Sequence, residues 1–316
     1  MKTITLNDLA NNFDCDVSSF GERFVTFYNT LDMSYESVEG ESYDNLILEC
    51  LQKLDIDKQV IGAPERTGEW FDGWKENLDD FLANGTRESL VPRFVRPNKV
   101  VRYQRKFIKP SNPYFERDFC KLIQIFCYDN FMKKENVDNV YEFGCGSSFN
   151  IMELYDLSKE DGLNLNFYGS DFVESSVNLL NSVGARYDAP LSAELFNMIE
   201  PNYDYEIREN SCVFTFGTIE QLDSKFKNYI NFLIHKKPKI CFHIEPTVEN
   251  YDENNLFDYL QIKFHTQRGY TQGLVPYIEE LEKAGKVDIL KKKRLDFGSK
   301  FMEGYHLIVW SPKFGS

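Results

Sequence analysis

Two glycines follow an apolar, strand-like run at a position where a ligand can approach the backbone. The stretch from Val140 to Gly146 reads Val-Tyr-Glu-Phe-Gly-Cys-Gly, so Gly144 and Gly146 flank a single residue. Glycine accepts positive φ and has no side chain, which lets a nucleoside lie close to the backbone where a strand gives way to a helix. A dinucleotide site would need a small residue three positions after Gly146, but Phe149 stands there. The run therefore indicates a nucleoside site and counts against a nicotinamide dinucleotide.

Two groups that can transfer protons lie on one later strand. The segment from Ile240 to Pro246 is apolar except for His243 and Glu245. Successive side chains alternate across a strand, so these two share one side and one of them can orient the other. The carboxyl end of such a strand opens on the ligand crevice of an α/β sheet, and we therefore expect Glu245 to act as a general base with His243 beside it. A histidine satisfied by the backbone inside the core is the alternative for His243.

Further polar groups follow on a helix-like stretch that ends near Gly269. His265 offers an alternative base, and Arg268 has the planar fork that binds a phosphate or carboxylate through two hydrogen bonds. Together with Tyr270, these residues are expected to form a wall of the substrate site. A capped helix end that carries surface polar groups is an equally weighted alternative.

The elements that must position these residues alternate from residue 112 onward. Alternation of strands and helices is typical of a parallel sheet covered by helices on both faces. Strands are predicted at 139–143, 165–168 with Asp171 at the tip, 193–198, 212–216 and 240–244, and a closing antiparallel pair at 287–290 and 306–310. Helices are predicted at 112–132, 174–183 with Gly184 as the stop, 225–234 and 276–284.

The first 110 residues have a different pattern and are interpreted as a helical addition, separate from residues 111–316. Helices are predicted near 19–31, 42–54 and 69–83. For Trp70, Phe71 and Trp74, packing of a helix onto the core is favoured over a lid on the crevice. An extended arm at 91–108 carries the basic residues Arg93, Arg96, Lys99, Arg102, Arg105 and Lys106. This arm either faces a substrate or, as favoured, exposes its charges to solvent.

The run from Glu142 to Gly146 resembles motif I of the class I S-adenosylmethionine-dependent methyltransferases, with an acid two residues before the first glycine and no third glycine. Asp171 stands at the tip of the second strand, where the family places an acid, and Asn197 stands after the third, where the family more often has Asp. The run from Phe214 to Leu222 resembles motif IV. The resemblance covers residues 112–312 and implies an α/β fold with a seven-stranded Rossmann-like sheet, mostly parallel with the last strand antiparallel.

The same resemblance implies a role for each matching residue toward S-adenosylmethionine. Glu142 or the turn beside it would help to place the methionine amino group, and Gly144 and Gly146 would admit the nucleoside. Asp171 would accept hydrogen bonds from both ribose hydroxyls, and Asn197 would read adenine. Phe172 would pack on the ribose or adenine, although burial in the core is the favoured alternative. The remaining positions come from the motif IV run: Phe216 and Gly217 below the cofactor, and Glu220 on the substrate side.

Composition limits the partners. The chain of 316 residues carries a formal net charge of −14, which disfavours a nucleic acid substrate. Neither a signal segment nor a membrane-spanning run is evident in the sequence, so we expect a soluble, cytoplasmic protein. Seven scattered cysteines fit a reducing compartment and lack zinc-type spacing, and no set of carboxylates suggests a magnesium site.

The sequence therefore predicts an S-adenosylmethionine-dependent methyltransferase that acts on a small molecule. The expected reaction is O-methylation of a sugar or of a phosphorylated or carboxylated metabolite, in polysaccharide or secondary metabolism. A non-catalytic binding or scaffold protein that has the cofactor fold is the alternative, and an NAD-dependent oxidoreductase is less favoured. The N-terminal helices offer a surface for a homodimer.

Overall fold

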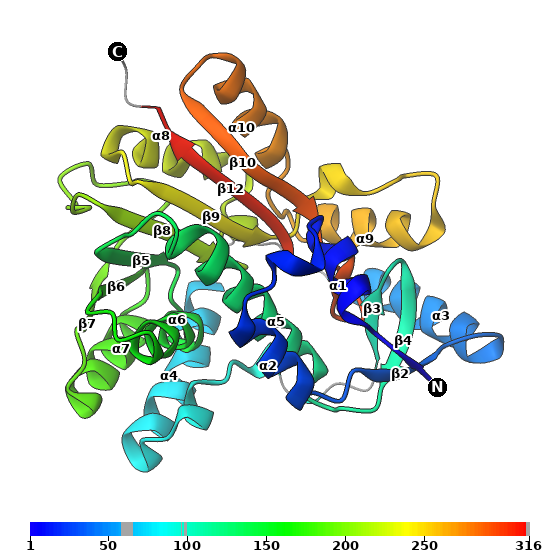
Figure 1. The fold of residues 1–316 in the computed structure, drawn as a ribbon. Helices are drawn as coiled ribbons and strands as arrows, with labels where there is room; N and C mark the ends of the chain where they lie inside the picture. Colours follow the sequence, from blue (N-terminus) through cyan, green and yellow to red (C-terminus); the bar gives the residue numbers. More distant parts are fainter. Residues whose placement is uncertain (58–65, 96, 98–99, 314–316) are drawn as a thin grey trace.

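A seven-stranded sheet forms the centre of the molecule (Figure 1). The structure is a computed structural model that describes residues 1–57, 66–95, 97 and 100–313. In spatial order the strands are β10 (Val287–Arg294), β12 (His306–Pro312), β9 (Ile240–Glu245), β8 (Ser211–Phe216), β5 (Asn139–Phe143), β6 (Asn166–Asp171) and β7 (Leu191–Leu195). The strands from β9 to β7 pair in parallel, and β12 is antiparallel to both of its neighbours. This confirms the predicted sheet and its antiparallel last strand.

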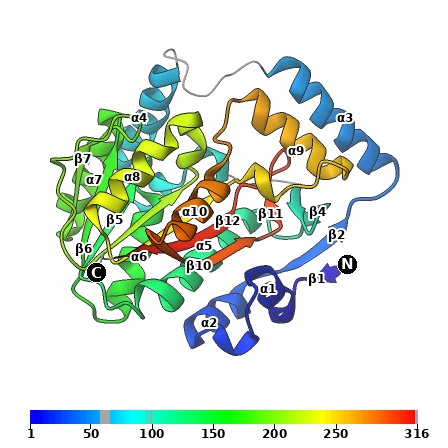
Figure 2. The same cartoon turned by 90° about the horizontal axis from the view of Figure 1, so that it is seen from above.

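Helices cover both faces of this sheet because its buried strands are apolar on both sides (Figure 2). Along β5, Val140 packs into one core, while Tyr141 and Phe143 pack into the other. The first core takes α5 (Phe115–Cys127), α6 (Phe149–Glu160) and α7 (Glu174–Tyr187), and the second takes α8 (Phe226–Lys236) and α10 (Leu274–Lys283). None of the helices in the described part of the chain combines the length and apolar character that a bilayer-spanning segment needs.

One predicted helix end is wrong, and its glycine has another use. Helix α7 continues past Gly184 to Tyr187 and ends at Asp188, which adopts the left-handed conformation with φ 47°. A Cβ atom at Gly184 would lie 2.4 Å from the carbonyl oxygen of Leu191. Gly184 therefore allows α7 to lie close to β7 inside the helix rather than ending it.

The first 110 residues contain the three predicted helices and, in addition, a first helix, α1, and strands that the sequence pattern does not predict. The helices are α1 (Leu6–Phe13), α2 (Glu22–Thr30), α3 (Glu41–Ile56) and α4 (Arg66–Asn84). A second sheet consists of β1 (Lys2–Thr3), β2 (Ser34–Ser37), β4 (Lys106–Pro110), β3 (Val101–Tyr103) and β11 (Phe297–Gly298), in that order. Because β11 comes from the C-terminal part of the chain, this sheet crosses the predicted boundary at residue 110. The boundary itself stays a prediction.

The predicted basic arm at 91–108 forms a short 3₁₀ turn, Arg93–Val95, and then the hairpin of β3 and β4. Arg102 is fully buried, contrary to the expectation of exposed charge: its guanidinium donates to the carbonyl oxygens of Lys300 and Phe257 at 2.8 and 3.1 Å. It also lies over the ring of Phe257, 4.0 Å from the centroid. Arg96 and Lys99 lie outside the described residues.

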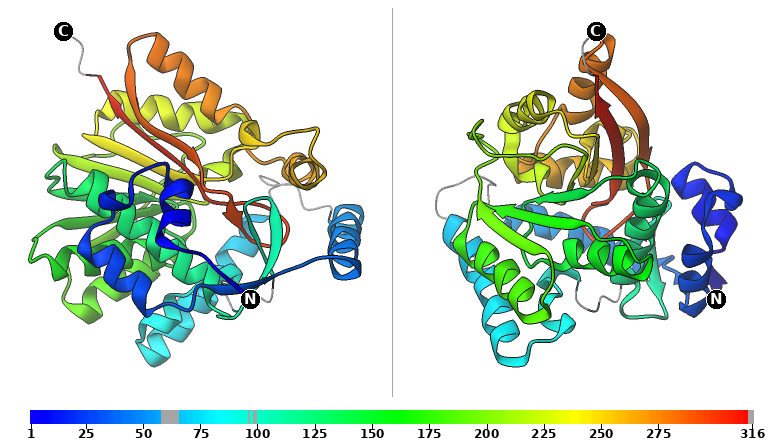
Figure 3. Two further views of the ribbon diagram at one scale, coloured as in Figure 1. Left: turned by 45° about the vertical axis from the view of Figure 1, so that its right-hand side comes forward. Right: turned by 60° about the vertical axis from the view of Figure 1, so that its left-hand side comes forward.

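Helices α3 and α9 (Leu256–Gln267) lie next to one another beside the small sheet (Figure 3). Their shared core includes Leu46 and Cys50 from α3 and Phe257 and Leu260 from α9. The N-terminal segment is thus packed against elements that follow the end of β9.

Candidate functional site

The glycine turn lies where β5 passes into α6, and its backbone is fixed by β6. The amides of Gly144 and Cys145 donate to the carbonyl oxygen of Ser170 at 2.7 and 3.0 Å. Gly144 has φ 73°, and a Cβ atom there would lie 2.2 Å from the Thr218 methyl group. Glycine is therefore required at this position both by the conformation of the turn and by the residue that faces it.

Glu142 lies behind the turn rather than on a cavity wall. Its carboxylate is 1% exposed and accepts hydrogen bonds from the Asn150 side chain at 3.1 Å and from the Ile151 amide at 3.0 Å. Burial raises the pKa of this carboxyl well above its usual value. Glu142 thus holds the first turn of α6, and any effect on a ligand passes through the turn.

Asp171 ends β6, directly beside the glycine turn. Its two carboxylate oxygens accept hydrogen bonds from the amides of Gly146 at 3.0 Å and Val173 at 3.2 Å. Burial raises the pKa of Asp171, and these amide donors oppose that shift. The carboxylate is held at the strand end, and the neighbouring Phe172 is 51% exposed rather than part of the core.

Two further loops complete this end of the sheet. Asn197 follows β7 and accepts a hydrogen bond from the Ile199 amide at 2.9 Å. Gly217 follows β8 with φ 65°, donates to the carbonyl oxygen of Ile244 at 2.9 Å, and has no atom within 4 Å of where a Cβ would be. The space above Gly217 is therefore open to a ligand.

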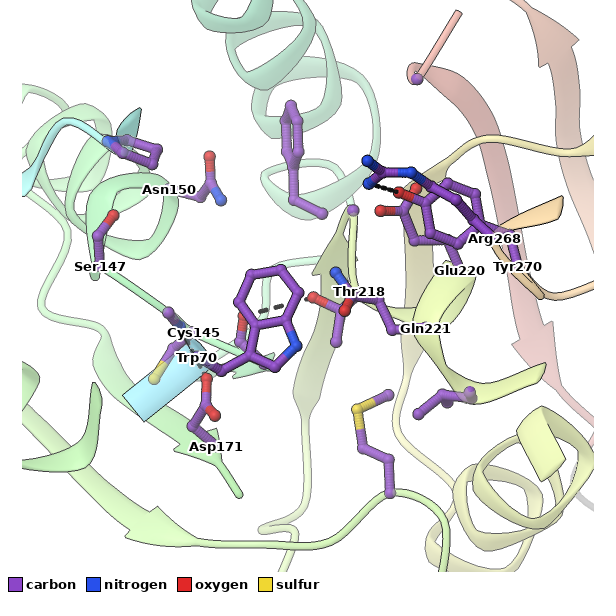
Figure 4. A pocket seen from close by; sticks show the side chains of 18 of the residues that line it. Trp70, Cys145, Ser147, Asn150, Asp171, Thr218, Glu220, Gln221, Arg268 and Tyr270 are labelled. Atoms are coloured by element: carbon purple, nitrogen blue, oxygen red, sulfur yellow. Dashed lines mark hydrogen bonds between the residues drawn. The ribbon is translucent and has the colours of Figure 1, made fainter. Parts of the chain in front are cut away.

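These loops surround a cavity of about 730 Å³ at the carboxyl ends of the parallel strands (Figure 4). A crevice at this edge is where open α/β sheets bind ligands, and the volume lies in the range of small-molecule sites. Of the residues predicted to bind cofactor or substrate, those on the wall are Gly144, Gly146, Asp171, Phe172, Asn197, Phe216, Gly217, Glu220, Arg268 and Tyr270. Among the residues predicted to bind cofactor or substrate, Glu142 alone does not line the cavity.

The predicted bases are not on the wall. Glu245 is fully buried: one oxygen accepts from the Thr215 hydroxyl at 2.7 Å and the Thr218 amide at 3.0 Å, and the other accepts from the Glu220 amide at 3.2 Å. Burial raises its pKa to about 6, and these hydrogen bonds oppose the shift. Its observed contacts are those of a carboxylate that organises the loop after β8.

His243 and His265 are also fully buried. The Thr215 hydroxyl already donates to Glu245, so its 2.9 Å contact with His243 Nδ1 assigns that nitrogen as the donor. His265 Nε2 donates to the carbonyl oxygen of Thr271 at 2.7 Å. Burial lowers the pKa of His243 to about 3 and that of His265 to about 4. Each ring therefore has one hydrogen-bond partner inside the fold, and within the described residues His243 Nε2 and His265 Nδ1 have none. His265 is buried, so the alternative of a surface polar group at a helix end does not describe it.

Arg268 reaches the wall but already binds a carboxylate. Its guanidinium bonds to Asp57 Oδ2, at 3.0 Å from Nε, and contacts the Tyr270 hydroxyl at 3.3 Å. The Lys53 ammonium lies 3.1 Å from the same oxygen of Asp57. The cation expected to hold an anionic substrate therefore belongs to an ion-pair cluster between α3 and the end of α9.

A carboxylate and a phenol that were not among the named site residues share the cavity wall. Glu116, on α5, accepts a hydrogen bond from the Tyr305 hydroxyl at 2.8 Å, and both side chains are almost fully buried. One signal was available in the sequence: Glu116 lies three and seven residues before Phe119 and Ile123, on the apolar face of the predicted helix. An acid on such a face is a candidate for a polar site.

Trp70 and Trp74 differ from the favoured expectation of packing in the core. Both are half-buried on α4 and line the cavity. In Figure 4 the Trp70 indole projects across the cavity between Asp171 and Thr218. The N-terminal segment thus contributes to the wall.

No family model and no curated protein matches this chain. Similar solved structures include the [4+2]-cyclase SpnF, with a TM-score of 0.50 and 8% identity over 81% of this chain and 98% of that one. A second is the citrinin polyketide synthase CMeT domain, with a TM-score of 0.45 and 10% identity over 96% of this chain and 93% of that one. A third is TehB from Haemophilus influenzae, with a TM-score of 0.41 and 11% identity over 66% of this chain and 69% of that one. At such identities the likeness concerns the fold alone.

The strand order, the antiparallel strand β12 and the glycine turn after β5 together define one fold. The chain has the Rossmann-like fold of the class I S-adenosylmethionine-dependent methyltransferase superfamily.

Proposed function

We propose that this protein is an S-adenosylmethionine-dependent methyltransferase that acts on a small molecule, with oxygen as the acceptor atom. The observation that carries the proposal is the cavity at the carboxyl ends of β5, β6 and β8, whose wall contains seven of the eight residues expected to bind the cofactor. The cavity continues beyond them toward Glu116, Glu220 and Tyr270, which leaves room for an acceptor beside the cofactor.

The residues of this wall fit the cofactor. Gly144, Gly146 and Gly217 give a backbone surface without side chains, and the Asp171 carboxylate offers acceptors for ribose hydroxyls. Exposed Phe172 and the apolar side chains of Phe196 and Met198 suit adenine. When bound, S-adenosylmethionine supplies a methyl group on a positively charged sulfur.

The chain itself would align the acceptor and take its proton. We assign the base to Glu116, whose carboxylate is on the wall and is oriented by the Tyr305 hydroxyl. Glu220 is the second carboxylate on the acceptor side. Phe216, Phe264 and Phe301 line the same region, and such aromatic walls exclude water from the reacting groups.

A sugar or another hydroxyl-bearing metabolite is the acceptor class that this wall supports best. A phosphorylated or carboxylated acceptor was expected because of Arg268. Since its guanidinium is bonded to Asp57, a neutral hydroxyl acceptor has the better support. A role in polysaccharide or secondary metabolism belongs to the same proposal.

A role without methyl transfer is the second candidate, and one comparison favours keeping it. Of the three similar structures named above, the one with the TM-score of 0.50 is titled a [4+2]-cyclase, so this fold hosts other chemistry. A cofactor-binding scaffold would have the same turn and cavity. An NAD-dependent oxidoreductase has less support, because Phe149 begins α6 where a dinucleotide fold needs a small residue.

The first test is calorimetry of the purified protein with S-adenosylhomocysteine. We expect binding by the wild type and a loss of about tenfold or more in Asp171→Ala, the scale of a buried charge-assisted hydrogen bond. Asp204→Ala is the matched control because Asp204 is exposed and is not among the wall residues. Absence of binding by the wild type would overturn the proposal. Binding without turnover in a broad acceptor screen would favour the scaffold.

A further inference from the structure

Two stacked tryptophans on α4 are the feature of this cavity that the proposed function does not use. Trp70 and Trp74 are one helical turn apart, and their ring centroids lie 5.9 Å apart at an interplanar angle of 22°. Both line the cavity, whereas the third tryptophan of the chain, Trp310, is fully buried in the second core. Two half-buried indoles on one cavity wall are a large planar surface for a ligand.

The pair lies against the glycine turn. A Cβ atom at Gly146 would be 3.0 Å from the Cζ2 atom of Trp74, so the missing side chain at Gly146 leaves room for the indole. Trp70 is one turn nearer the start of α4 and extends across the cavity between Asp171 and Thr218 (Figure 4). The indoles therefore face the same residues that are expected to hold the nucleoside.

Helix α4 is fixed in this position by one contact between the two tryptophans and by others that follow them. The Ser175 hydroxyl, in the first turn of α7, donates to the carbonyl oxygen of Phe71 at 2.8 Å. Farther along α4, the Asn77 amide donates to the carbonyl oxygen of Ser89 at 2.7 Å, and Phe81 is fully buried. Since α7 begins at Glu174, three residues after Asp171, the helix that carries the indoles is attached to the element beside the expected ribose site.

We infer that Trp70 and Trp74 form an aromatic roof over the nucleoside half of the cavity and contact the adenosyl group of the bound cofactor. The ligand identity in this inference rests on the proposed function. Indole faces stack on nucleobases whatever their hydrogen-bonding pattern, so the roof adds affinity for the purine opposite the glycine turn. It also makes the N-terminal segment part of the cofactor site.

Calorimetry with S-adenosylhomocysteine and with adenosine tests the roof. Trp70→Ala should weaken binding of both ligands by about tenfold, the scale of one lost base-stacking contact. Phe71→Ala is the matched control: Phe71 is the next residue on the helix, is 39% exposed and is not among the wall residues, so its variant should keep wild-type affinity.

Tryptophan fluorescence gives a second readout that needs no truncation of the side chain. Ligand should change the emission of the wild type and of Trp70→Phe and Trp74→Phe by different amounts. It should leave the emission of the double Phe variant, in which Trp310 alone emits, unchanged. If Trp70→Ala binds with wild-type affinity, or if the emission of the wild type does not change when ligand binds, the proposed aromatic roof is wrong while the proposed function stands. No binding of S-adenosylhomocysteine by the wild type would overturn the proposed function together with the roof.

Discussion

Glu245 shows how a buried carboxylate can serve the backbone of a site without touching its ligand. Its two oxygens accept three hydrogen bonds, two of them from amides of the loop that carries Thr218 and Glu220 onto the cavity wall. The carboxylate therefore acts on the position of that loop. We therefore expect substitution of Glu245 to lower the stability of the fold more directly than it lowers the rate of the reaction.

Glu245→Gln should lower the free energy of unfolding by about 1–3 kcal/mol, because an amide has one acceptor oxygen and its NH₂ group must face a donor. Urea unfolding at neutral pH measures the change. Glu253→Gln, at an exposed position, is the control and should unfold like the wild type. An unchanged midpoint for Glu245→Gln would contradict this structural role.

His265 should make the protein sensitive to mild acid. Burial lowers its pKa from 6.5 to about 4, so the folded state binds fewer protons than the unfolded state between these values. Its contribution to stability is complete above pH 6.5 and is lost as the pH falls toward 4. Between pH 7.5 and 5 the wild type should lose about 2 kcal/mol more than His265→Gln, which keeps a donor for Thr271 but does not titrate. Urea unfolding at the two pH values measures this difference, and equal losses would contradict it.

Glu116→Gln should separate catalysis from binding. If Glu116 is the base, kcat should fall about 100-fold or more while the affinity for S-adenosylhomocysteine stays near the wild-type value. Glu220→Gln, at the other carboxylate of the acceptor side, is the matched comparison and should keep most of kcat. The reverse ranking would move the role of base to Glu220. Steady-state kinetics with an accepted substrate and calorimetry together give both quantities.

At the residue scale, the sequence predicts contacts that are local and misses those that join distant segments. Gly144, Gly146 and Asp171 could be found because a strand end and a turn fix them within a short stretch. The bond between Arg268 and Asp57 joins residues 211 positions apart, and that between Tyr305 and Glu116 joins residues 189 positions apart. No periodicity in the sequence indicates such pairs, so Arg268 was predicted to be available to a substrate.

At the element scale, the turn after β5 makes a specific demand for glycine. An alanine at position 144 would be strained by the positive φ, and its Cβ atom would also clash with the Thr218 side chain. Gly162 has a similar φ of 69°, but no atom lies within 4 Å of where its Cβ would be. Gly162→Ala should therefore cost about 1 kcal/mol of strain alone. Gly144→Ala should cost more and should also abolish binding of S-adenosylhomocysteine. Thermal unfolding and calorimetry of the two variants check this, and equal behaviour would contradict the role of Thr218.

The inner strands β5, β8, β9 and β12 were predictable because they are buried, mostly apolar runs bounded by turn residues. The strand at 139–143 was predicted with the bounds it has in the structure. The small sheet was not, since β1 and β11 have two residues each and exist only because partners pair with them. Strands of that length have no period to detect.

At the scale of the whole molecule, the N-terminal segment and the sheet share one core. Phe13 packs on Phe126, with ring centroids 4.5 Å apart, and Phe119 stacks on Phe297 at 3.9 Å. Phe24 and Val140 belong to the same buried cluster. The segment therefore covers apolar surface that residues 111–316 cannot cover alone.

Residues 111–316 expressed without the first 110 should fail to form a stable fold, because their side of this core would be exposed. Near-ultraviolet circular dichroism and limited proteolysis, with the full chain as control, would report the loss of fixed packing. A fragment that unfolds cooperatively and binds S-adenosylhomocysteine would instead show that residue 110 is a true domain boundary and that the tryptophan roof is dispensable.

The pairing of β11 with β3 also sets the order in which the protein can form during synthesis. Phe297 lies opposite Tyr103, so the small sheet lacks its strand β11 until residues 297–298 have left the ribosome. Strand β12, which lies between β10 and β9 in the large sheet, emerges later still. Until residue 312 has been synthesised, the nascent chain consequently carries unpaired strand edges and uncovered aromatic side chains, and such surfaces are prone to aggregation.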